Sequence, residues 1–377
     1  MRLTAGPRWV ALALAAALGL GGCSLFGPDK PKPKALEPLT PQSVAAPLWN
    51  QRIGAVQFPL TVAVAGGAFT LGASDGTVLA VDIETGLDRW RTNVGAALSA
   101  GVGSDGRFAA VVTQAGDLVT LEGGQVKWRK PVGTRVATAP LVAGERVFVL
   151  GVDRSVQAFD ALDGRKLWTL RRPGDPLTLA QAGVIAAFKN TLVVGQGPRL
   201  AGIDPTAGTV RWEVPIGAPR GANEVERLAD LIGPVTRIGS TLCARSFQAA
   251  VGCVDGDRGT LVWTRNAGGT DAVAGDAGYL FGADASDRVT AWRMESGVPA
   301  WTSDALLNHV LSGAAVLGGS VVFGSADGML HWFSRDKGEA QLRLPTDSSG
   351  VGVPLVVSGS TLLAVTRSGG LYAFRPR

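Results

Sequence analysis

The sequence predicts an all-β fold: an eight-bladed β-propeller of four-stranded antiparallel blades, its ring closed by an N-terminal strand. The main observation is a repeat of about forty residues in which a glycine stands four residues ahead of a tryptophan. A period of this length, with β-type segments inside it, is typical of propellers, solenoids and arrays. The pairs are Gly86/Trp90, Gly124/Trp128, Gly164/Trp168, Gly208/Trp212, Gly259/Trp263 and Gly297/Trp301, and Gly338/Leu342 is a seventh copy with leucine in the tryptophan position.

The third copy illustrates how one repeat forms a blade. Val147–Leu150 is an apolar run, and Val156–Asp160 alternates apolar with polar residues after a turn-rich stretch. Asp160 and Gly164 then predict a turn, because aspartate can bond to its own backbone and glycine supplies a positive φ. With the preceding run Ala139–Ala143 this makes four strands. The same aspartate recurs as Asp82, Asp204 and Asp255.

The blades can be counted. Glycine-rich hairpins lead into eight third strands, near 75–81, 115–121, 153–159, 199–203, 249–254, 287–292, 327–333 and 368–374. Outer strands marked by tryptophan or leucine follow only seven of them, ending at 90, 128, 168, 212, 263, 301 and 342. We therefore expect Leu48-Trp49-Asn50 to supply the eighth outer strand and to close the ring, which protects sheet edges.

Seven tryptophans sit in outer strands, and we expect each ring to pack between neighbouring blades. Trp292 and Trp332 lie on inner strands and are also expected to be buried. The outer-strand residues are Trp49, Trp90, Trp128, Trp168, Trp212, Trp263 and Trp301.

Residues 1–22 are expected to be a signal peptide. Arg2 and Arg8 precede an apolar run of twelve residues, which is too short to span a bilayer. The ending Leu20-Gly21-Gly22-Cys23 resembles a bacterial lipoprotein box, in which Cys23 becomes the lipidated first residue. Ser24, in place of an aspartate that would retain the protein at the inner membrane, favours the outer membrane. Residues 23–45 follow as a tether rich in proline and lysine, which favours extended chain, and residues 46–377 form the propeller.

The charge balance argues against a nucleic-acid partner. Without Arg2 and Arg8 the chain has 34 basic and 31 acidic residues, a net charge of +3, and these residues are scattered.

Cys243 and Cys253 flank a hairpin centred near residue 248. A symmetric hairpin would make them face each other across adjacent strands. A disulfide, which an oxidising periplasm permits, and two buried small residues are both compatible with this pattern.

The residues that catalysis would need are sparse. The chain has two histidines, His309 and His331, and no cluster of cysteine and histidine with zinc-ligand spacing. No motif of an activated nucleophile is present. We therefore expect neither an enzyme nor a metal or cofactor site.

The repeat Val-x-Ala-x-Asp-x-x-x-Gly-x-x-x-Trp resembles that of pyrroloquinoline quinone (PQQ) dehydrogenases. Those enzymes use adjacent cysteines and calcium ligands above the quinone, and this chain has no adjacent cysteines. Together with the lipoprotein box, the chain resembles the BamB family of the outer-membrane β-barrel assembly machinery. The most specific stretches are 224–230, 306–309, 328–332 and 347–350. This resemblance implies a scaffold without catalysis that binds the periplasmic POTRA domains of BamA and aids nascent barrel proteins.

The resemblance also implies a docking surface. Leu177 and Leu179 match the family's binding loop, and Ala180 stands where relatives can have arginine. Asp230 matches an acid of a second loop, where we expect electrostatic fit at the rim of the contact, and Ile232 replaces a second aspartate. Both segments join an outer strand to the next inner strand, so alternating strand directions predict that they share one face. The tryptophan spacing rises to 44 and 51 residues there, against 38 to 41 elsewhere, and enlarged loops often carry function.

Two other functions remain open from the sequence. A periplasmic PQQ-type oxidoreductase would share the repeat, and absorbance after adding PQQ and calcium would reveal it. A polysaccharide- or peptidoglycan-binding module would expose aromatic side chains on one face.

Overall fold

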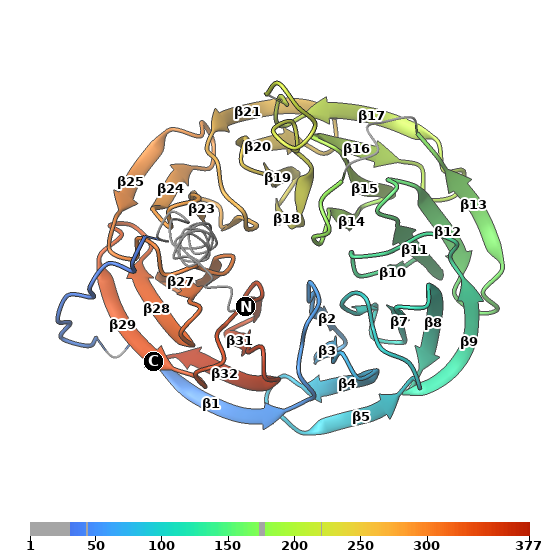
Figure 1. The fold of residues 1–377 in the computed structure, drawn as a ribbon, viewed down its shortest axis with the longest axis horizontal. Coiled ribbons are helices and arrows are strands. Elements are labelled where there is room, and N and C mark those ends of the chain that lie inside the picture. The colour runs from blue at the N-terminus through green and yellow to red at the C-terminus, as the bar shows by residue number, and fades with distance from the viewer. Residues whose placement is uncertain (1–30, 43, 173–177, 220) are drawn as a thin grey trace, which may run out of the picture. The chain divides into compact units, whose positions relative to one another are not determined.

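The structure, a computed structural model, describes residues 31–42, 44–172, 178–219 and 221–377. Cys23 and Leu177 therefore lie outside the described residues. The unit Lys34–Arg377 contains eight four-stranded antiparallel sheets that follow one another around a ring (Figure 1). No helix in the described parts of the chain is long and apolar enough to cross a membrane.

Blades 1 to 7 each use four consecutive strands, from the innermost to the outermost. Blade 1 has β2 (Ala63–Ala65), β3 (Ala68–Gly72), β4 (Thr77–Asp82) and β5 (Asp88–Asn93); blade 2 has β6 (Gly103–Ser104), β7 (Phe108–Val112), β8 (Asp117–Glu122) and β9 (Gln125–Pro131). Blade 3 has β10 (Leu141–Ala143), β11 (Arg146–Leu150), β12 (Val156–Asp160) and β13 (Lys166–Leu170); blade 4 has β14 (Ile185–Phe188), β15 (Thr191–Gln196), β16 (Arg199–Ile203) and β17 (Val210–Pro215). Blade 5 has β18 (Leu231–Ile238), β19 (Thr241–Ser246), β20 (Ala250–Asp255) and β21 (Thr260–Asn266); blade 6 has β22 (Ala274–Gly275), β23 (Tyr279–Ala283), β24 (Val289–Arg293) and β25 (Pro299–Ser303). Blade 7 has β26 (Ala315–Leu317), β27 (Ser320–Gly324), β28 (Met329–Ser334) and β29 (Ala340–Pro345).

Blade 8 joins the two ends of the described chain. Its inner strands are β30 (Val356–Ser358), β31 (Thr361–Val365) and β32 (Gly370–Pro376), and its outer strand is β1 (Ala45–Arg52). β1 pairs antiparallel with β32 from Ala45 opposite Pro376 to Arg52 opposite Gly370. The predicted closure at Trp49 is therefore confirmed.

The hydrophobic core is divided among the interfaces between blades. Eight clusters of buried apolar side chains each draw on two consecutive blades, and the cluster between blades 8 and 1 completes the ring. Trp292 and Trp332 belong to two of these clusters, as expected.

Each outer-strand tryptophan lies over the glycine turn of the next blade. These glycines have φ between 63° and 82°, and a Cβ atom added to Gly297 would lie 2.5 Å from the ring of Trp263. The indole Nε1–H of five tryptophans also donates to a carbonyl of that turn, at 2.7–3.0 Å. The repeat motif is thus a contact between blades as well as a turn.

The structure explains why leucine replaces tryptophan at position 342. The next blade is blade 8, whose strands β32 and β1 come from distant parts of the chain and are not joined by a turn. Leu342 has no glycine turn to cover and packs instead beside Ala45 and Phe374.

The predicted aspartate turns form as expected. The Oδ1 atom of Asp82 accepts the backbone N–H groups of Glu84 and Thr85, at 3.1 and 3.0 Å. Asp204 accepts the backbone and hydroxyl of Thr206, and these hydrogen bonds hold the pKa of its carboxyl well below the usual range.

The last part of the predicted tether contacts the propeller. Residues 34–42 run beside the outer strand of blade 7 before the chain enters β1 (Figure 1, dark blue). Leu36 packs into the cluster between blades 6 and 7.

Candidate partner-docking face

The connections between blades lie on one face of the ring. Strands alternate in direction within each blade, so every link from an outer strand to the next inner strand reaches the same side, together with the hairpins between second and third strands. We call this side the connection face. The opposite side, which carries the aspartate–glycine turns between third and outer strands, is the turn face.

Two long connections occupy neighbouring positions on the connection face. Loop 171–184 joins β13 to β14, and loop 216–230 joins β17 to β18. Gly183 forms an isolated β-bridge with Ile232, so the ends of the two loops are held side by side. The sequence expectation that both segments share a face is met by this arrangement.

Asp230 links the two loops. Its Oδ2 atom accepts the backbone N–H of Leu179 at 3.0 Å, and its Oδ1 atom accepts Nη2 of Arg154 at 2.9 Å. The Asp230 side chain is only 14% exposed. Both carboxylate oxygens therefore accept hydrogen bonds within the chain, and the expected electrostatic role of Asp230 at the rim of a partner contact stays a prediction.

The other predicted residues have distinct environments. Leu179 is half-buried, and the neighbouring Thr178 hydroxyl donates to the carbonyl of Val152 at 2.8 Å. Ala180 is exposed, whereas Ile232 is buried inside β18. Since Ile232 is a core residue here, it offers no polar group to the connection face.

Three arginine side chains gather beside loop 171–184, which the sequence did not indicate. Glu213 accepts Nη1 of Arg172 at 2.6 Å and Nε of Arg199 at 2.7 Å. These residues line a recess of about 370 Å³ together with Arg154 and Gln196. The arginines come from three different elements, so no local motif could have revealed the cluster.

Further hollows continue along the same face. A recess of about 800 Å³ lies between blades 2 and 3 and is lined by Gln114, Arg135, Thr178 and Ala180, among others. On loop 216–230, Glu226 accepts the backbone N–H of Ala222 at 2.7 Å and holds a compact turn. That turn presents Val225 with 68% of its surface exposed.

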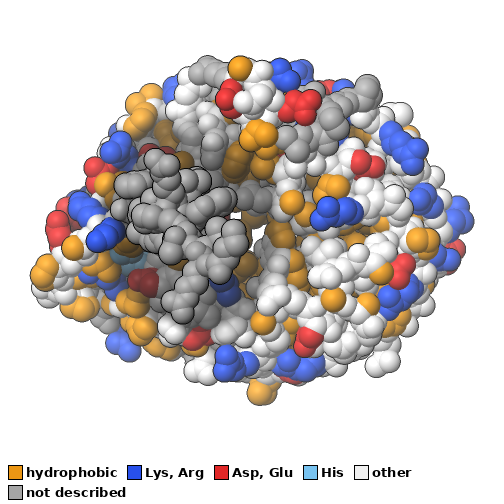
Figure 2. Space-filling view, viewed as in Figure 1, with side chains coloured by type: hydrophobic (Ala, Val, Ile, Leu, Met, Phe, Trp, Pro, Cys, Tyr) orange, Lys and Arg blue, Asp and Glu red, His pale blue; other side chains and the backbone are white. Residues whose placement is uncertain are grey.

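On the face drawn in Figure 2, the charged side chains of the described residues do not form a surface of a single sign. Figure 2 shows acidic and basic side chains interspersed around the rim among the described residues visible in that view. Many charged side chains of the described residues form ion pairs, such as Arg107 with Glu122 at 2.7 Å. This mixture fits the low net charge of the sequence.

One polar cluster includes residue types found in hydrolases. Ser325 donates to Asp327 at 2.5 Å, and its Oγ lies 3.0 Å from Nε2 of His331. Burial lowers the pKa of His331 to about 4, so the imidazole is neutral at pH 7. Ser325 and His331 are both buried, and the aspartate contacts the serine rather than the histidine. Asp327 is exposed, and the cluster lacks the order of a catalytic triad, in which the aspartate contacts the histidine.

Metal ligands do not gather in the described ranges. Within them, no group of three or more His, Cys, Asp or Glu side chains has a suitable arrangement.

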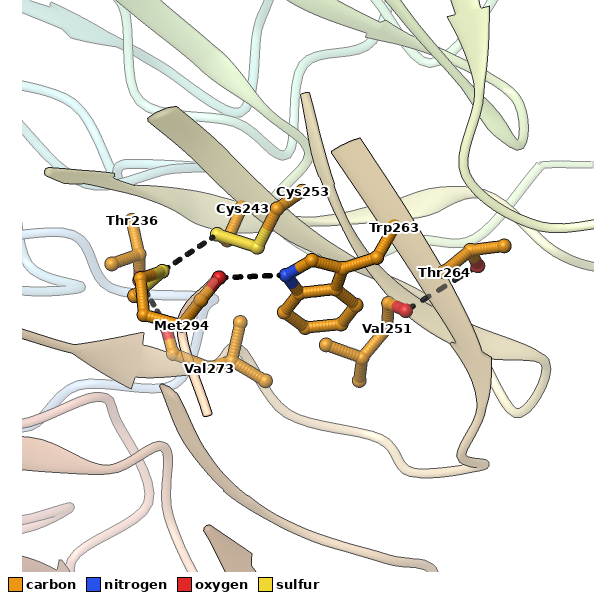
Figure 3. The surroundings of a disulfide bond; sticks show 8 residues. All are labelled: Thr236, Cys243, Val251, Cys253, Trp263, Thr264, Val273 and Met294. Carbon is orange, nitrogen blue, oxygen red and sulfur yellow. Dashed lines mark hydrogen bonds between the residues drawn. A yellow bond between two sulfur atoms is a disulfide. The ribbon is translucent and has the colours of Figure 1, made fainter. Parts of the chain in front are cut away.

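The two cysteines are joined in blade 5. Cys243 of β19 pairs with Cys253 of β20, with sulfur atoms 1.96 Å and Cα atoms 4.0 Å apart. Figure 3 shows the disulfide beside Met294 and Trp263, whose indole donates to the Met294 carbonyl. Both cysteines are fully buried, so they form part of the interface between blades 5 and 6.

The fold and the repeat define the class: an eight-bladed propeller built from PQQ-type repeats, with enlarged loops on its connection face. The sequence profile described as "Outer membrane protein assembly factor BamB" matches residues 74–303. A protein of that name from Burkholderia pseudomallei is 33% identical over 96% of each chain. The chain belongs to the BamB family.

Solved structures agree on the fold. The structure of BamB from Moraxella catarrhalis has a TM-score of 0.79 at 20% identity, covering 88% of this chain and all of that one. Quinohemoprotein alcohol dehydrogenase from Comamonas testosteroni has a TM-score of 0.66 at 14% identity, covering 88% and 76%. The similarity to the alcohol dehydrogenase is a similarity of the propeller fold alone.

Proposed function

We propose that this chain is a non-catalytic scaffold of the outer-membrane β-barrel assembly machinery that docks the POTRA domains of BamA. The names of its relatives describe outer membrane protein assembly factors. The main support for a docking site on this face is the hydrogen bond from the Leu179 N–H to the Asp230 carboxylate, which holds loop 171–184 against loop 216–230. A pre-organised surface binds more tightly because less conformational freedom is lost on association.

In this proposal loop 171–184 contacts the partner, and Asp230 of loop 216–230 holds it in position. Leu177 and Leu179 supply the apolar anchors, because a few such side chains usually carry most of the binding energy. Asp230 and Arg154 hold the backbone of the anchor segment in position. The arginines around Glu213 border the contact and contribute to electrostatic fit.

The proposed compartment is the periplasmic side of the outer membrane, with lipid on Cys23 as the anchor and residues 1–22 removed. Membrane affinity then resides in the acyl chains. The Cys243–Cys253 bond suits an oxidising compartment. Mass spectrometry of the purified protein would detect both modifications, and normal membrane attachment without lipid on residue 23 would contradict the anchor.

Affinity purification from detergent-solubilised envelope tests the proposed class. We expect BamA to be recovered with the tagged chain. Recovery of a periplasmic dehydrogenase activity that depends on PQQ, without BamA, would favour the oxidoreductase instead. That alternative is not favoured, because the only cysteines of the propeller are buried and bonded to each other.

A further inference from the structure

The feature that carries a new inference is residues 34–42, which we call the strap. The backbone N–H of Lys34 donates to the Leu307 carbonyl at 2.9 Å, and Nε2 of His309 donates to the Lys34 carbonyl at 2.9 Å. His309 is buried. The first residue of the strap is therefore held on both sides by one short segment of blade 7's entry loop.

The strap is also fixed along its length. Leu36 packs into the apolar cluster that contains Trp301 and Ala340. Nη1 of Arg343 donates to the Glu37 carbonyl at 2.8 Å, and the Gln42 N–H donates to the Gln341 carbonyl at 2.8 Å. A proline-rich linker would have been expected to remain free of the domain.

The two ends of the strap lie at opposite faces of the ring. Leu307 and His309 belong to the connection between β25 and β26, and every such connection lies on the connection face. Ala45 begins the outer strand β1 opposite Pro376, at the end of a third strand, which is the turn face. The strap therefore crosses the height of blade 7 from one face to the other.

We propose that the strap moves the exit of the lipid tether from the turn face to the connection face and thereby keeps the docking loops close to the membrane. This inference rests on the lipid anchor of the proposed function. Ten residues lie between Cys23 and Lys34, and the eleven steps from one to the other span at most about 40 Å when the chain is fully extended. Without the strap the free chain would run to Ala45, span up to about 80 Å, and start from the opposite face.

The experiment uses the lipidated full-length protein in liposomes whose headgroups carry a fluorescence quencher. Single cysteines replace Ala285 in a connection-face hairpin or Glu295 in a turn-face turn, both exposed and both on blade 6. The native propeller cysteines are bonded to each other, so the new thiol can be labelled alone. The test variant replaces residues 34–42 with nine glycine and serine residues, and Arg258→Ala is a surface control distant in sequence from the strap.

We expect the Ala285 label to be quenched at least about twofold more than the Glu295 label, because quenching follows the reach of the tether. Replacement of the strap should abolish or reverse this difference, while Arg258→Ala should keep it. Equal quenching of the two labels in the native sequence, or a difference that survives loss of the strap, would overturn the proposal.

Amide hydrogen exchange tests whether the strap is bound to the propeller, separately from whether Cys23 carries a lipid. We expect the Lys34 and Gln42 amides to be protected in the soluble propeller, since both donate to carbonyls. Rapid exchange at both would refute the strap itself. Protection together with an unlipidated Cys23 would instead refute the anchor of the proposed function, and the membrane orientation with it.

Discussion

At the scale of single residues, the glycine of each turn carries a contact between blades. Gly297 has φ of +66°, and its Cα lies so close to Trp263 that an added Cβ would clash with the ring. Gly144 has a similar φ of +58°, with nothing within 4 Å of an added Cβ. An alanine would strain the backbone at both positions, but it would clash with a tryptophan ring only at Gly297.

We predict that Gly297→Ala destabilises the propeller more than Gly144→Ala. Left-handed backbone costs about 1–2 kcal/mol for a residue with a side chain, and overpacking adds about 1–3 kcal/mol at Gly297 alone. Urea unfolding of both variants measures the difference. Equal losses would mean that the tryptophan contact does not contribute.

Asp347 is a second residue with a role in closure. It lies in the connection leading into blade 8 and accepts the hydroxyls of Thr366 at 2.7 Å and Ser368 at 2.9 Å. Partial burial raises the pKa of Asp347, but these hydrogen bonds and that of Ser349 outweigh it and lower the pKa to about 2. The ionised carboxylate is thus favoured in the folded state.

This pKa predicts a pH dependence for the stability that Asp347 contributes. A carboxyl whose folded pKa is lowered stabilises the fold above its unfolded pKa near 3.8, and the gain is lost as pH falls through about 2. Asp347→Asn should therefore cost about 1 kcal/mol at pH 7, allowing for solvent screening, and progressively less between pH 4 and pH 2. A cost that does not change with pH would contradict this assignment.

At the scale of elements, β1 closes the ring. Trp49 donates its indole N–H to the Ile83 carbonyl at 2.9 Å and covers Gly86 of blade 1. β1 thereby joins blade 8 to blade 1 as well as completing its own sheet.

Deletion of Leu48–Gln51 should destabilise the propeller strongly. Trp49 is partly buried against the cluster between blades 8 and 1, so its loss should cost part of the about 3–5 kcal/mol typical of a fully buried tryptophan, and the strand pairing is lost with it. Deletion of residues 29–32, upstream of the strap, is the control of equal length. Thermal unfolding at the same temperature for both deletions would argue against closure by β1.

Loop 171–184 depends on Asp230, whose partners are 51 and 76 residues away in the chain. Asp230→Ala removes two hydrogen bonds of a charged group, so we expect faster proteolysis within this loop and about tenfold weaker BamA binding. Global unfolding should change little, because the loop lies outside the blade core. Unchanged proteolysis would show that Asp230 does not position the loop.

The blades could be predicted because their determinants are local. Asp204 and Gly208 specify a turn within a few residues, and their repetition with Trp212 reveals the period. The roles of Asp230 and Leu36 could not be predicted, since each depends on partners from distant elements. The proline-rich composition around Leu36 indicates extended chain but says nothing of the apolar cluster that receives it.

At the scale of the whole molecule, the two faces of the ring carry different loops. The turn face repeats one short turn from blade to blade, whereas the connection face carries the two enlarged loops and the recesses beside them. The proposed scaffold function requires that the partner recognise the connection face. Leucine pairs on the two faces, Leu177 and Leu179 in loop 171–184 and Leu87 and Leu162 on the turn face, allow this requirement to be tested with matched variants.

The most direct measurement is the affinity of the purified protein for BamA POTRA domains. The test variant is Leu177→Ala with Leu179→Ala, and the control is Leu87→Ala with Leu162→Ala, two leucines of the turn face that are 69% and 45% exposed. We predict at least about tenfold weaker binding for the test variant, normal binding for the control, and native thermal unfolding for both. Normal binding by the test variant would contradict docking through loop 171–184, and its unfolding would assign those leucines to the core.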